Sequence, residues 1–271
     1  MSIKIHVLHC GAVRVDRSLP FREKSLNPIA YTGIFRKEAY QTWLPVSAYL
    51  IEHPKGLVLI DAGWHTDVRI DQKKHLGWLH HLINKARLPA GQAINEQLHQ
   101  RGIKPKDLDF VVLSHLHSDH VSGIQLVKDA RKILVSELEM LDTKKNRMGY
   151  VPSLWDGVRF DTFQFEKSEY GNEKFSFDLF GDDSIVFVST PGHTRGLTST
   201  LIQENGKFVL LCSDSGYARK SWEQMILPGV MVDKEKVISS LEWVRSMSQL
   251  PNCREVIANH DNDIKPHTIS F

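Results

Sequence analysis

Apolar residues along the chain gather in short runs that predict strands. Each run is bounded by glycine, proline, asparagine, aspartate or a charged residue, which is typical of strands with at least one buried face. The expected strands are Ile3–His9, Val46–Glu52, Leu57–Asp61, Asp109–Leu113, Lys132–Val135, Ser184–Ser189, Thr198–Gln203, Lys207–Cys212 and Glu255–Ala258. Asp109–Leu113 is apolar enough to be buried on both faces of a sheet.

Other stretches have the spacing of amphipathic helices. Apolar residues recur every three or four positions in 66–86, in 91–101 and, most clearly, in Asp233–Leu250. Ser136 and Glu139 have the spacing of a capping box, which predicts that another helix begins there. Strands that alternate with helices predict an α/β fold.

Two segments interrupt this alternation. Residues 11–45 are loop-rich, and 148–182 form an irregular, aromatic-rich insertion. Asn205-Gly206, between two expected strands, predicts a tight hairpin and an antiparallel pair within the sheet. Since no repeat or low-complexity segment divides the chain, we expect residues 1–271 to form a single domain with a sizeable core.

Composition and charge narrow the classes of partner. The net charge of +2, from 34 basic and 32 acidic residues, argues against a nucleic-acid partner. The N-terminus alternates like a strand, and no apolar run reaches the ~18 residues of a membrane span. Cys10, Cys212 and Cys253 are odd in number and widely separated, which favours a reducing compartment. We therefore expect a cytoplasmic protein without a membrane partner.

The chemistry of the chain is concentrated just after Asp109–Leu113. His115, His117, Asp119 and His120 lie close together there, and imidazole and carboxylate groups are ligands that zinc, iron or manganese accept. In extended chain, residues two apart point the same way, so His115 and His117 can reach one ion. If the chain then turns into a helix, Asp119 and His120 can reach a second ion nearby. Metal ions would satisfy a cluster of polar groups that is costly beside an apolar strand.

Three later strand ends repeat this arrangement. His193, Asp214 and His260 each closely follow an expected strand, in loops of mostly small or polar residues. Sites in α/β proteins form beyond the strand ends, so the repeated pattern predicts one shared site. Alone, Asp214 would more often cap a helix and His260 would more often lie in a surface loop.

The segment His115-Leu116-His117-Ser118-Asp119-His120, with the later His193, Asp214 and His260, resembles the metallo-β-lactamase superfamily. The resemblance runs from Asp61 to His260 and implies a four-layer αβ/βα sandwich with two facing mixed sheets and the metals at one edge. The ligand sets that it implies are His115, His117 and His193 for a first ion, Asp119, His120 and His260 for a second, and Asp214 as the bridge. Two Zn²⁺ are expected, with iron, manganese or cobalt as alternatives.

Within that superfamily the chain most resembles the N-acyl-homoserine lactonases, which are quorum-quenching enzymes. The shared features are the long N-terminal segment, the His-Leu-His-x-Asp-His motif, Tyr217 three residues after Asp214, and the closing His260-Asp261. In those lactonases the tyrosine contacts the substrate carbonyl or ester. The chain departs from them at Ser118, where a bulky residue is common, and at Asn259, where glycine is common.

These residues suggest a mechanism. Two cations that share Asp214 and a water would lower the pKa of that water, supply hydroxide as nucleophile and stabilise the oxyanion. Tyr217 would donate a hydrogen bond to the carbonyl oxygen, unless it is only a packed core tyrosine, and Asp119 would carry a proton to the leaving alkoxide. Asp61 is expected to orient a ligand histidine, unless it is only a turn aspartate. Aromatic residues of 21–43 and 148–182 would line an acyl pocket, unless they pack in the core.

The expected function is hydrolysis of a small-molecule lactone, namely an N-acyl-homoserine lactone. The alternatives on the same site are a thioesterase or another ester or amide hydrolase, such as a glyoxalase II-like enzyme. An iron-dependent oxidoreductase is a further alternative, although a complete second ligand set, with His117, His120 and His260, favours two metals over a single iron. An exposed aromatic N-terminal segment would be compatible with a homodimer.

Overall fold

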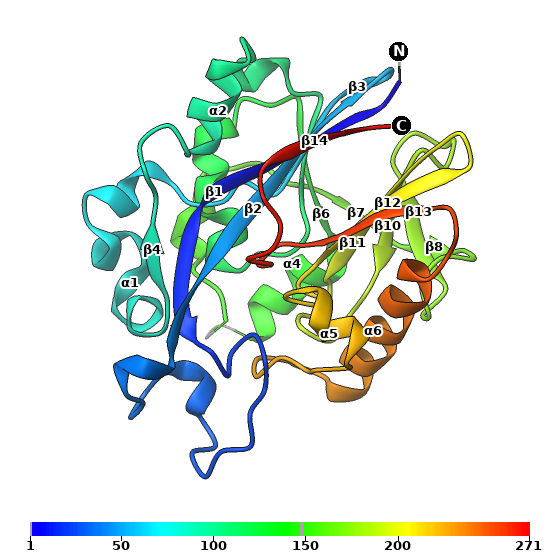
Figure 1. The fold of residues 1–271 in the computed structure, drawn as a ribbon. Coiled ribbons are helices and arrows are strands. Elements are labelled where there is room, and N and C mark those ends of the chain that lie inside the picture. The colour runs from blue at the N-terminus through cyan, green and yellow to red at the C-terminus, as the bar shows by residue number, and fades with distance from the viewer. Residues whose placement is uncertain (1, 147–148) are drawn as a thin grey trace.

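The computed structural model describes residues 2–146 and 149–271, and its strands form two mixed sheets (Figure 1). The first contains β1 (Lys4–Asp16), β2 (Gln41–His53), β3 (Gly56–Ile60), β4 (Lys85–Arg87), β5 (Phe110–Leu113), β6 (Lys132–Ser136), β7 (Asp161–Phe163) and β14 (His267–Ser270). The second contains β8 (Glu166–Lys167), β9 (Phe175–Asp178), β10 (Ile185–Ser189), β11 (Thr198–Glu204), β12 (Lys207–Ser213) and β13 (Cys253–Ala258).

The helices connect and cover these sheets. The α-helices are α1 (Gln72–Ile83), α2 (Ile94–Gln100), α3 (Ser118–Val121), α4 (Glu137–Lys145), α5 (Arg219–Glu223) and α6 (Lys234–Ser248). The 3-10 helices are η1 (Ala30–Thr32), η2 (Glu38–Tyr40), η3 (Thr66–Arg69), η4 (Pro105–Asp107), η5 (Ser122–Val127) and η6 (Pro152–Trp155). Within the described parts of the chain, none of the helices has the length and apolar character needed to cross a membrane.

The sheet orders explain why both sheets are mixed. The first sheet runs β14-β1-β2-β3-β5-β6-β7, with β4 beside β1, and the second runs β13-β12-β11-β10-β9-β8. Parallel pairs join β3 to β5, β5 to β6, β6 to β7 and β12 to β13, whereas the other pairs are antiparallel. The hairpin between β11 and β12 is confirmed, because Asn205 and Gly206 have φ angles of 52° and 73°, as a type I′ turn requires.

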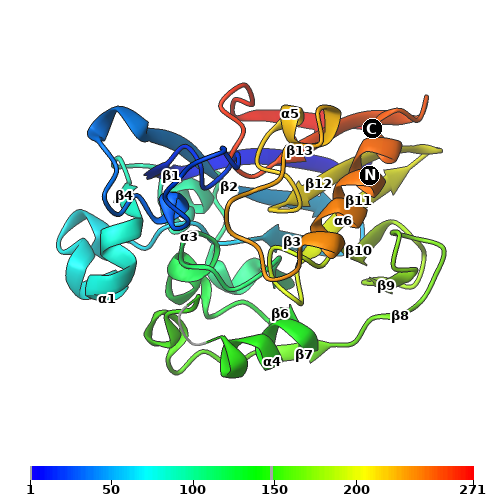
Figure 2. The ribbon, with the colours of Figure 1, turned by 90° about the horizontal axis from the view of Figure 1, so that it is seen from below.

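Several segments are more regular than their sequence suggests. β1 extends to Asp16 and β2 begins at Gln41, so the prediction of loops throughout 11–45 is wrong at both ends. A bulge between His9 and Ala12 shifts the pairing of β1 with β2 and breaks the alternation by which a strand is recognised. The loops and 3-10 turns of 17–40 (blue in Figure 2) lie near α1 and α3.

Further elements depart from the expected pattern. The helical stretch expected at 66–86 ends in β4, which pairs with β1, and α5 and β14 have no counterpart among the expected elements. The insertion 148–182 contains η6, β7, β8 and β9 rather than irregular chain, although Met148 lies outside the described residues. Strands of two to four residues carry too few positions to show a period, which is why the sequence did not reveal them.

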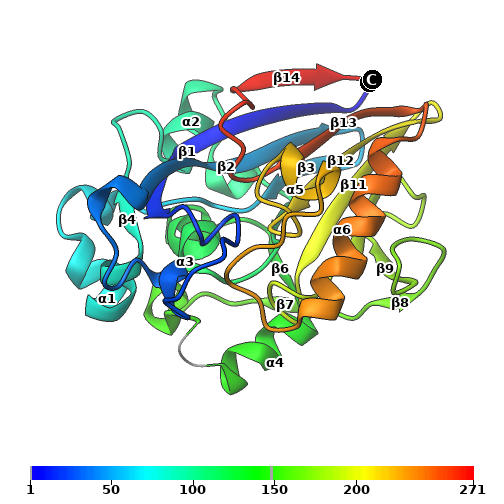
Figure 3. The same ribbon diagram turned by 60° about the horizontal axis from the view of Figure 1, so that its bottom comes forward.

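Helices lie on the outer faces of the two sheets, which gives four layers (Figure 3). Successive side chains of a strand point to opposite faces. In β5, Val112 packs between the two sheets, while Leu113 packs with Leu98 of α2 on the outer face. In β10, Phe187 packs between the sheets and Val186 packs under α6. The four-layer αβ/βα sandwich expected from the sequence is therefore confirmed.

Candidate metal centre

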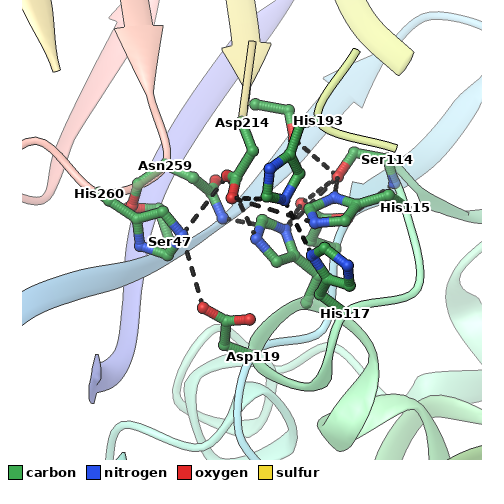
Figure 4. A network of polar contacts seen from close by, with 12 residues as sticks. Ser47, Ser114, His115, His117, Asp119, His193, Asp214, Asn259 and His260 are labelled. Carbon is green, nitrogen blue, oxygen red and sulfur yellow. Dashed lines mark hydrogen bonds and ion pairs between the residues drawn. The ribbon is translucent and has the colours of Figure 1, made fainter. Parts of the chain in front are cut away.

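The structure brings all seven predicted His and Asp side chains together where the loops after β5, β10, β12 and β13 meet (Figure 4). Three groups of ligand atoms each lie within 4.8 Å of one another. These groups are His115, His117 and His193; His115, His120 and Asp214; and Asp119, His120 and His260. The first and third groups match the two sets that the sequence resemblance implies, and the second joins them through Asp214.

Asp214 lies between the two sets and directs one carboxylate oxygen to each. Its Oδ1 is 3.3 Å from Nε2 of His120 and 3.4 Å from Nε2 of His260. Its Oδ2 is 3.4 Å from Nε2 of His193 and 4.0 Å from Nε2 of His115. A single carboxylate can therefore face two ions, as a bridging ligand must.

Groups outside this cluster fix the orientation of three histidines. Nδ1 of His120 donates to Oδ2 of Asp61 at 2.8 Å, the contact expected for Asp61. Nδ1 of His193 donates to the carbonyl oxygen of Val230 at 3.2 Å, and Nδ1 of His260 donates to that of Pro45 at 2.7 Å. In the neutral form with its proton on Nδ1, each of these imidazoles would present the Nε2 lone pair to the centre, which is the usual arrangement of metal-binding histidines.

Several buried atoms of the cluster need a partner that the chain does not supply. Nε2 of His115, Nε2 of His120 and Oδ1 of Asp214 have no hydrogen-bond partner among the residues that the structure describes. Leaving a buried polar group unsatisfied costs about 1–3 kcal/mol, and more for a charged one. Divalent cations would satisfy all three atoms at once, so the residues present fit a pair of metal ions.

The electrostatics of the cluster are consistent with this fit. Burial and neighbouring imidazoles hold the pKa of His115 and of His117 well below the ordinary value, so both are neutral, the form that binds a metal. Burial opposes ionisation of Asp214, but His260 and His120 hold the pKa of its carboxyl well below the usual range. Burial opposes protonation of His120 and His260, but the Asp214 carboxylate raises the pKa of both above the ordinary value, so cations that bind there would replace protons on these two imidazoles. The site thus combines the neutral donors His115 and His117 with an ionised carboxylate.

Strained turns and a serine network support the ligand loops. Asp61 and Ser213 have φ angles of 60° and 47°, a left-handed conformation that is unfavourable for residues other than glycine and is often stored at functional sites. The Ser213 hydroxyl donates to Oγ of Ser114 at 2.8 Å, and the Ser114 hydroxyl donates to Oδ2 of Asp61 at 2.9 Å. This chain of contacts joins the ends of β3, β5 and β12, and so links the two sheets beneath the cluster.

Glu139 is a buried residue of the site whose role the sequence did not show. Its amide donates to Oγ of Ser136 at 3.1 Å, as a helix cap requires, but its carboxylate turns away from the cap. The carboxylate accepts from the amide of Leu116 at 2.9 Å, from the Thr194 hydroxyl at 2.6 Å and from the Tyr150 hydroxyl at 2.9 Å. It therefore joins the loop of His115 and His117 to the loop of His193. Burial raises its pKa to about 7.

Tyr217 lies beside the cluster, as expected. Its ring stacks on that of His260 with centroids 5.2 Å apart and meets the edge of His193 at 5.9 Å. The ring is almost fully buried. Burial, together with Asp214 and Asp119, raises the pKa of its hydroxyl well above the usual value, so the hydroxyl stays protonated and can donate.

An apolar cavity of about 270 Å³ opens onto the cluster and onto Tyr217. Its apolar side chains, here called the pocket wall, are Val13, Val15, Leu19, Tyr31, Leu44, Ile83 and Val230. His80 and Asn84, which the sequence analysis did not single out, add polar groups at the end of α1.

The expectation of an aromatic wall is largely wrong. Within the described residues, Tyr31 is the one aromatic side chain of 21–43 that lines the cavity, and 148–182 contributes only Gly149. Phe163 and Phe177 pack between the two sheets instead, because β7 and β9 turn them inward. Composition alone could not separate these core aromatic residues from pocket residues.

Comparisons with known proteins agree with this geometry. The model of the Metallo-beta-lactamase superfamily matches residues 41–252. N-acyl homoserine lactonase AttM of Agrobacterium fabrum is 30% identical over 226 residues, which cover 81% of this chain and 83% of that protein. An N-acyl homoserine lactone hydrolase solved with N-hexanoyl-L-homoserine at its catalytic metal centre superposes with a TM-score of 0.76 at 20% identity, covering 97% of this chain and 95% of that one.

A further solved structure shares the fold. AidC, a dizinc quorum-quenching lactonase, superposes with a TM-score of 0.64 at 16% identity over 99% of this chain and 94% of its own. The family model matches the chain from β2 to α6, a range that includes six of the seven clustered residues. The seventh, His260, lies beyond the matched range, in the loop after β13. The four-layer fold, the order of the clustered side chains and the matched family model lead to one conclusion: the chain belongs to the metallo-beta-lactamase superfamily.

Proposed function

We propose that this protein is a dimetal lactonase that opens the ring of N-acyl homoserine lactones. The observation that carries the proposal is the position of Asp214 between two sets of ligand atoms, next to an apolar cavity that also contains Tyr217. The lactonase AttM, at 30% identity over most of both chains, supports the lactone as the substrate class.

The geometry of the cluster supports an assignment of residues to the two ions. His115, His117 and His193 would hold the first ion, Asp119, His120 and His260 the second, and Asp214 both. Nitrogen and carboxylate donors suit zinc, and AidC is described as a dizinc lactonase, so we propose two Zn²⁺ per chain. When bound, the ions would supply a water of lowered pKa and a positive charge for the developing oxyanion.

The chain's own side chains would then position the substrate and move the proton. The Tyr217 hydroxyl would donate a hydrogen bond to an oxygen of the lactone ester. Asp119, whose Oδ2 is 3.5 Å from Nε2 of His260 at the cavity floor, would pass a proton to the ring oxygen as it leaves. The leaving group of a lactone is an alkoxide that stays tethered to the product, so one proton carrier is sufficient.

The pocket wall would hold the acyl chain. Its aliphatic residues from β1, β2 and α1 line the same cavity as residues of the ligand cluster. Each buried methylene of an acyl chain contributes about 0.8 kcal/mol to binding. His80 and Asn84 could instead contact the amide group that joins the acyl chain to the lactone ring.

A substrate panel tests the proposal. We expect kcat/KM for N-acyl homoserine lactones to exceed that for an acyl thioester and for a β-lactam by at least about tenfold. Elemental analysis of the same sample should give two zinc ions per chain. A higher kcat/KM for the thioester would favour a glyoxalase II-like thioesterase. Stoichiometric iron with substrate-dependent oxygen consumption would exclude hydrolysis as the main activity.

A further inference from the structure

A second group of metal-binding side chains lies outside the central cluster. His65, Asp67 and His75 each place a ligand atom within 4.8 Å of the other two. His65 precedes η3, Asp67 belongs to η3, and His75 lies in the first turn of α1. The two imidazole side chains are only 16% and 12% exposed, whereas Asp67 is 57% exposed. The group is therefore a partly buried nitrogen pair with a carboxylate on its open side.

The distances within this group suit one small cation. Nδ1 of His65 is 3.3 Å from Oδ1 of Asp67, and Nδ1 of His75 is 3.9 Å from Oδ2 of the same carboxylate. The two imidazole centroids are 5.2 Å apart. Two ligands of a tetrahedral ion, each bonded at about 2.1 Å, lie roughly 3.4 Å from one another. The two rings are stacked with their planes 17° apart, so at least one ring would have to turn for both Nδ1 atoms to face the same ion.

Ser122 orients this group from behind. Its hydroxyl oxygen lies 2.8 Å from Nε2 of His75 and accepts a hydrogen bond from the amide of His65 at 3.0 Å. When Nε2–H of His75 donates to this oxygen, Nδ1 carries the lone pair that faces Asp67, as in metal-binding histidines with an outer hydrogen-bond partner. Nδ1 of His65 also accepts from the Asp67 amide at 3.1 Å, so an ion would compete with that single contact.

The open side of the group leads to a surface hollow lined by Asp67, Asp71, Lys74 and His75. Water can reach the ion position from this hollow and complete its coordination. Structural zinc sites usually have four protein ligands, whereas three protein ligands with water in the fourth position are typical of catalytic zinc sites, so we expect this site to hold its ion less tightly than a structural one. Two imidazoles and one carboxylate favour zinc or another first-row transition metal over magnesium or calcium.

We propose that His65, Asp67 and His75 form a third, mononuclear site for a zinc-class divalent cation, exchangeable and weaker than the central pair. An ion there would tie η3 and α1 to Ser122, two residues after His120 on the segment that carries Asp119 and His120. Since α1 also contributes Ile83 to the pocket wall, the site would stiffen one side of the cavity. The site is defined by metal uptake alone and does not depend on the proposed lactonase activity.

Zinc binding to the protein with its central pair filled tests this proposal. We expect equilibrium dialysis against Zn²⁺, followed by elemental analysis, to give three ions per wild-type chain and two per chain for His75→Gln and for Asp67→Asn. At free Zn²⁺ about 100 times the Kd of the third site, the midpoint of thermal unfolding should rise by about 5 °C in the wild type and stay unchanged in both variants.

Matched controls make the outcome decisive. His99→Gln removes an exposed histidine of α2 and should still bind three ions. Asp67→Asn keeps the size of a half-exposed side chain, so it decides the matter even if His75→Gln does not fold. Saturation of the wild type at two ions, a third ion retained by Asp67→Asn, or loss of the third ion in His99→Gln would each overturn the proposal.

Discussion

The ligand loops (114–120, 193–194, 213–214 and 259–260) and the pocket wall meet at one cavity but are held in different ways. In the loops, directional contacts fix the side chains, such as Asp61 to His120 and the Pro45 carbonyl to His260. The wall consists of apolar side chains from five separate segments, which pack together in one apolar cluster. Directional bonds tolerate little change, whereas apolar packing tolerates size changes with small losses. We therefore expect substitutions in the loops to affect rate, and substitutions in the wall to affect substrate preference.

The largest effect should follow removal of a ligand side chain. His117→Ala and Asp214→Ala should each lower kcat/KM by at least about 10³-fold, because the groups that stabilise the oxyanion lose their position. Metal content should fall in parallel, while the far-ultraviolet circular dichroism stays that of the wild type. His99→Ala, on the exposed face of α2, is the control and should keep full activity. Activity above a tenth of wild type in either ligand variant would contradict the proposed roles.

A smaller effect is expected at Glu139, which supports the ligand loops without lying among the ligands. In Glu139→Ala, the Leu116 amide and the Thr194 hydroxyl lose their acceptor at about 1–3 kcal/mol each, whereas the Tyr150 hydroxyl keeps Asp142, so the free energy of unfolding should fall by about 4 kcal/mol. Urea unfolding measures this change. Glu242→Ala, at an exposed position of α6, should change it by less than about 0.5 kcal/mol. Equal effects of the two variants would show that Glu139 does not hold the loops together.

The pH dependence of stability should show that the Glu139 carboxyl is buried. Its pKa is raised to about 7 in the folded chain, so the folded state keeps the proton to higher pH than the unfolded state. At pH values below the unfolded-state pKa of this carboxyl, its contribution to the free energy of unfolding is fully present. That contribution, on the order of 3 kcal/mol, is lost as the pH rises through about 7. Glu139→Gln does not titrate, so the wild type should lose stability relative to this variant between about pH 5 and pH 7. A constant difference across that range would contradict the raised pKa.

The smallest effect is expected in the pocket wall. Ile83→Ala removes apolar surface that would contact the acyl chain, so KM for a ten-carbon acyl homoserine lactone should rise about fivefold to tenfold. The kcat should stay within about twofold, and a four-carbon substrate should be affected much less. Steady-state kinetics on the two substrates measures the difference. If kcat fell equally for both, the distinction between loops and wall would fail.

The difference between the ligand loops and the pocket wall also explains which residues of the site could be predicted from the sequence. The ligand residues directly follow apolar strands, so strand ends and residue type together located His115, Asp214, His260 and even Asp61. The wall comes from segments without a clear period: β1 is interrupted by a bulge, η1 lies in a loop, and α1 is broken at Gly77, whose φ of 75° and ψ of 157° are not helical. Apolar residues in such segments look alike whether they face a cavity or the core.

The helix start expected from Ser136 and Glu139 is confirmed, since α4 begins at Glu137 with Ser136 as its N-cap, but the role of the Glu139 carboxylate could not be predicted. A glutamate three residues after a serine matches a capping box in any sequence, and only the folded chain shows that its carboxylate accepts from Leu116, Tyr150 and Thr194 instead. Partners this far apart in the sequence leave no local pattern. Roles that depend on several distant segments therefore had to come from the structure.

The contact between His260 and Pro45 has a consequence for the order in which the protein matures. These residues are 215 positions apart, and Ser47 also donates to the carbonyl oxygen of Asn259, 212 positions away. During synthesis, His115, His117 and His193 leave the ribosome well before β13, so one ligand trio can assemble early. The second trio, Asp119, His120 and His260, can form only after β13 has paired with β12 and the loop after β13 has come into contact with β2. Such distant contacts form slowly, so uptake of the full complement of ions would mark a chain whose two halves have already docked.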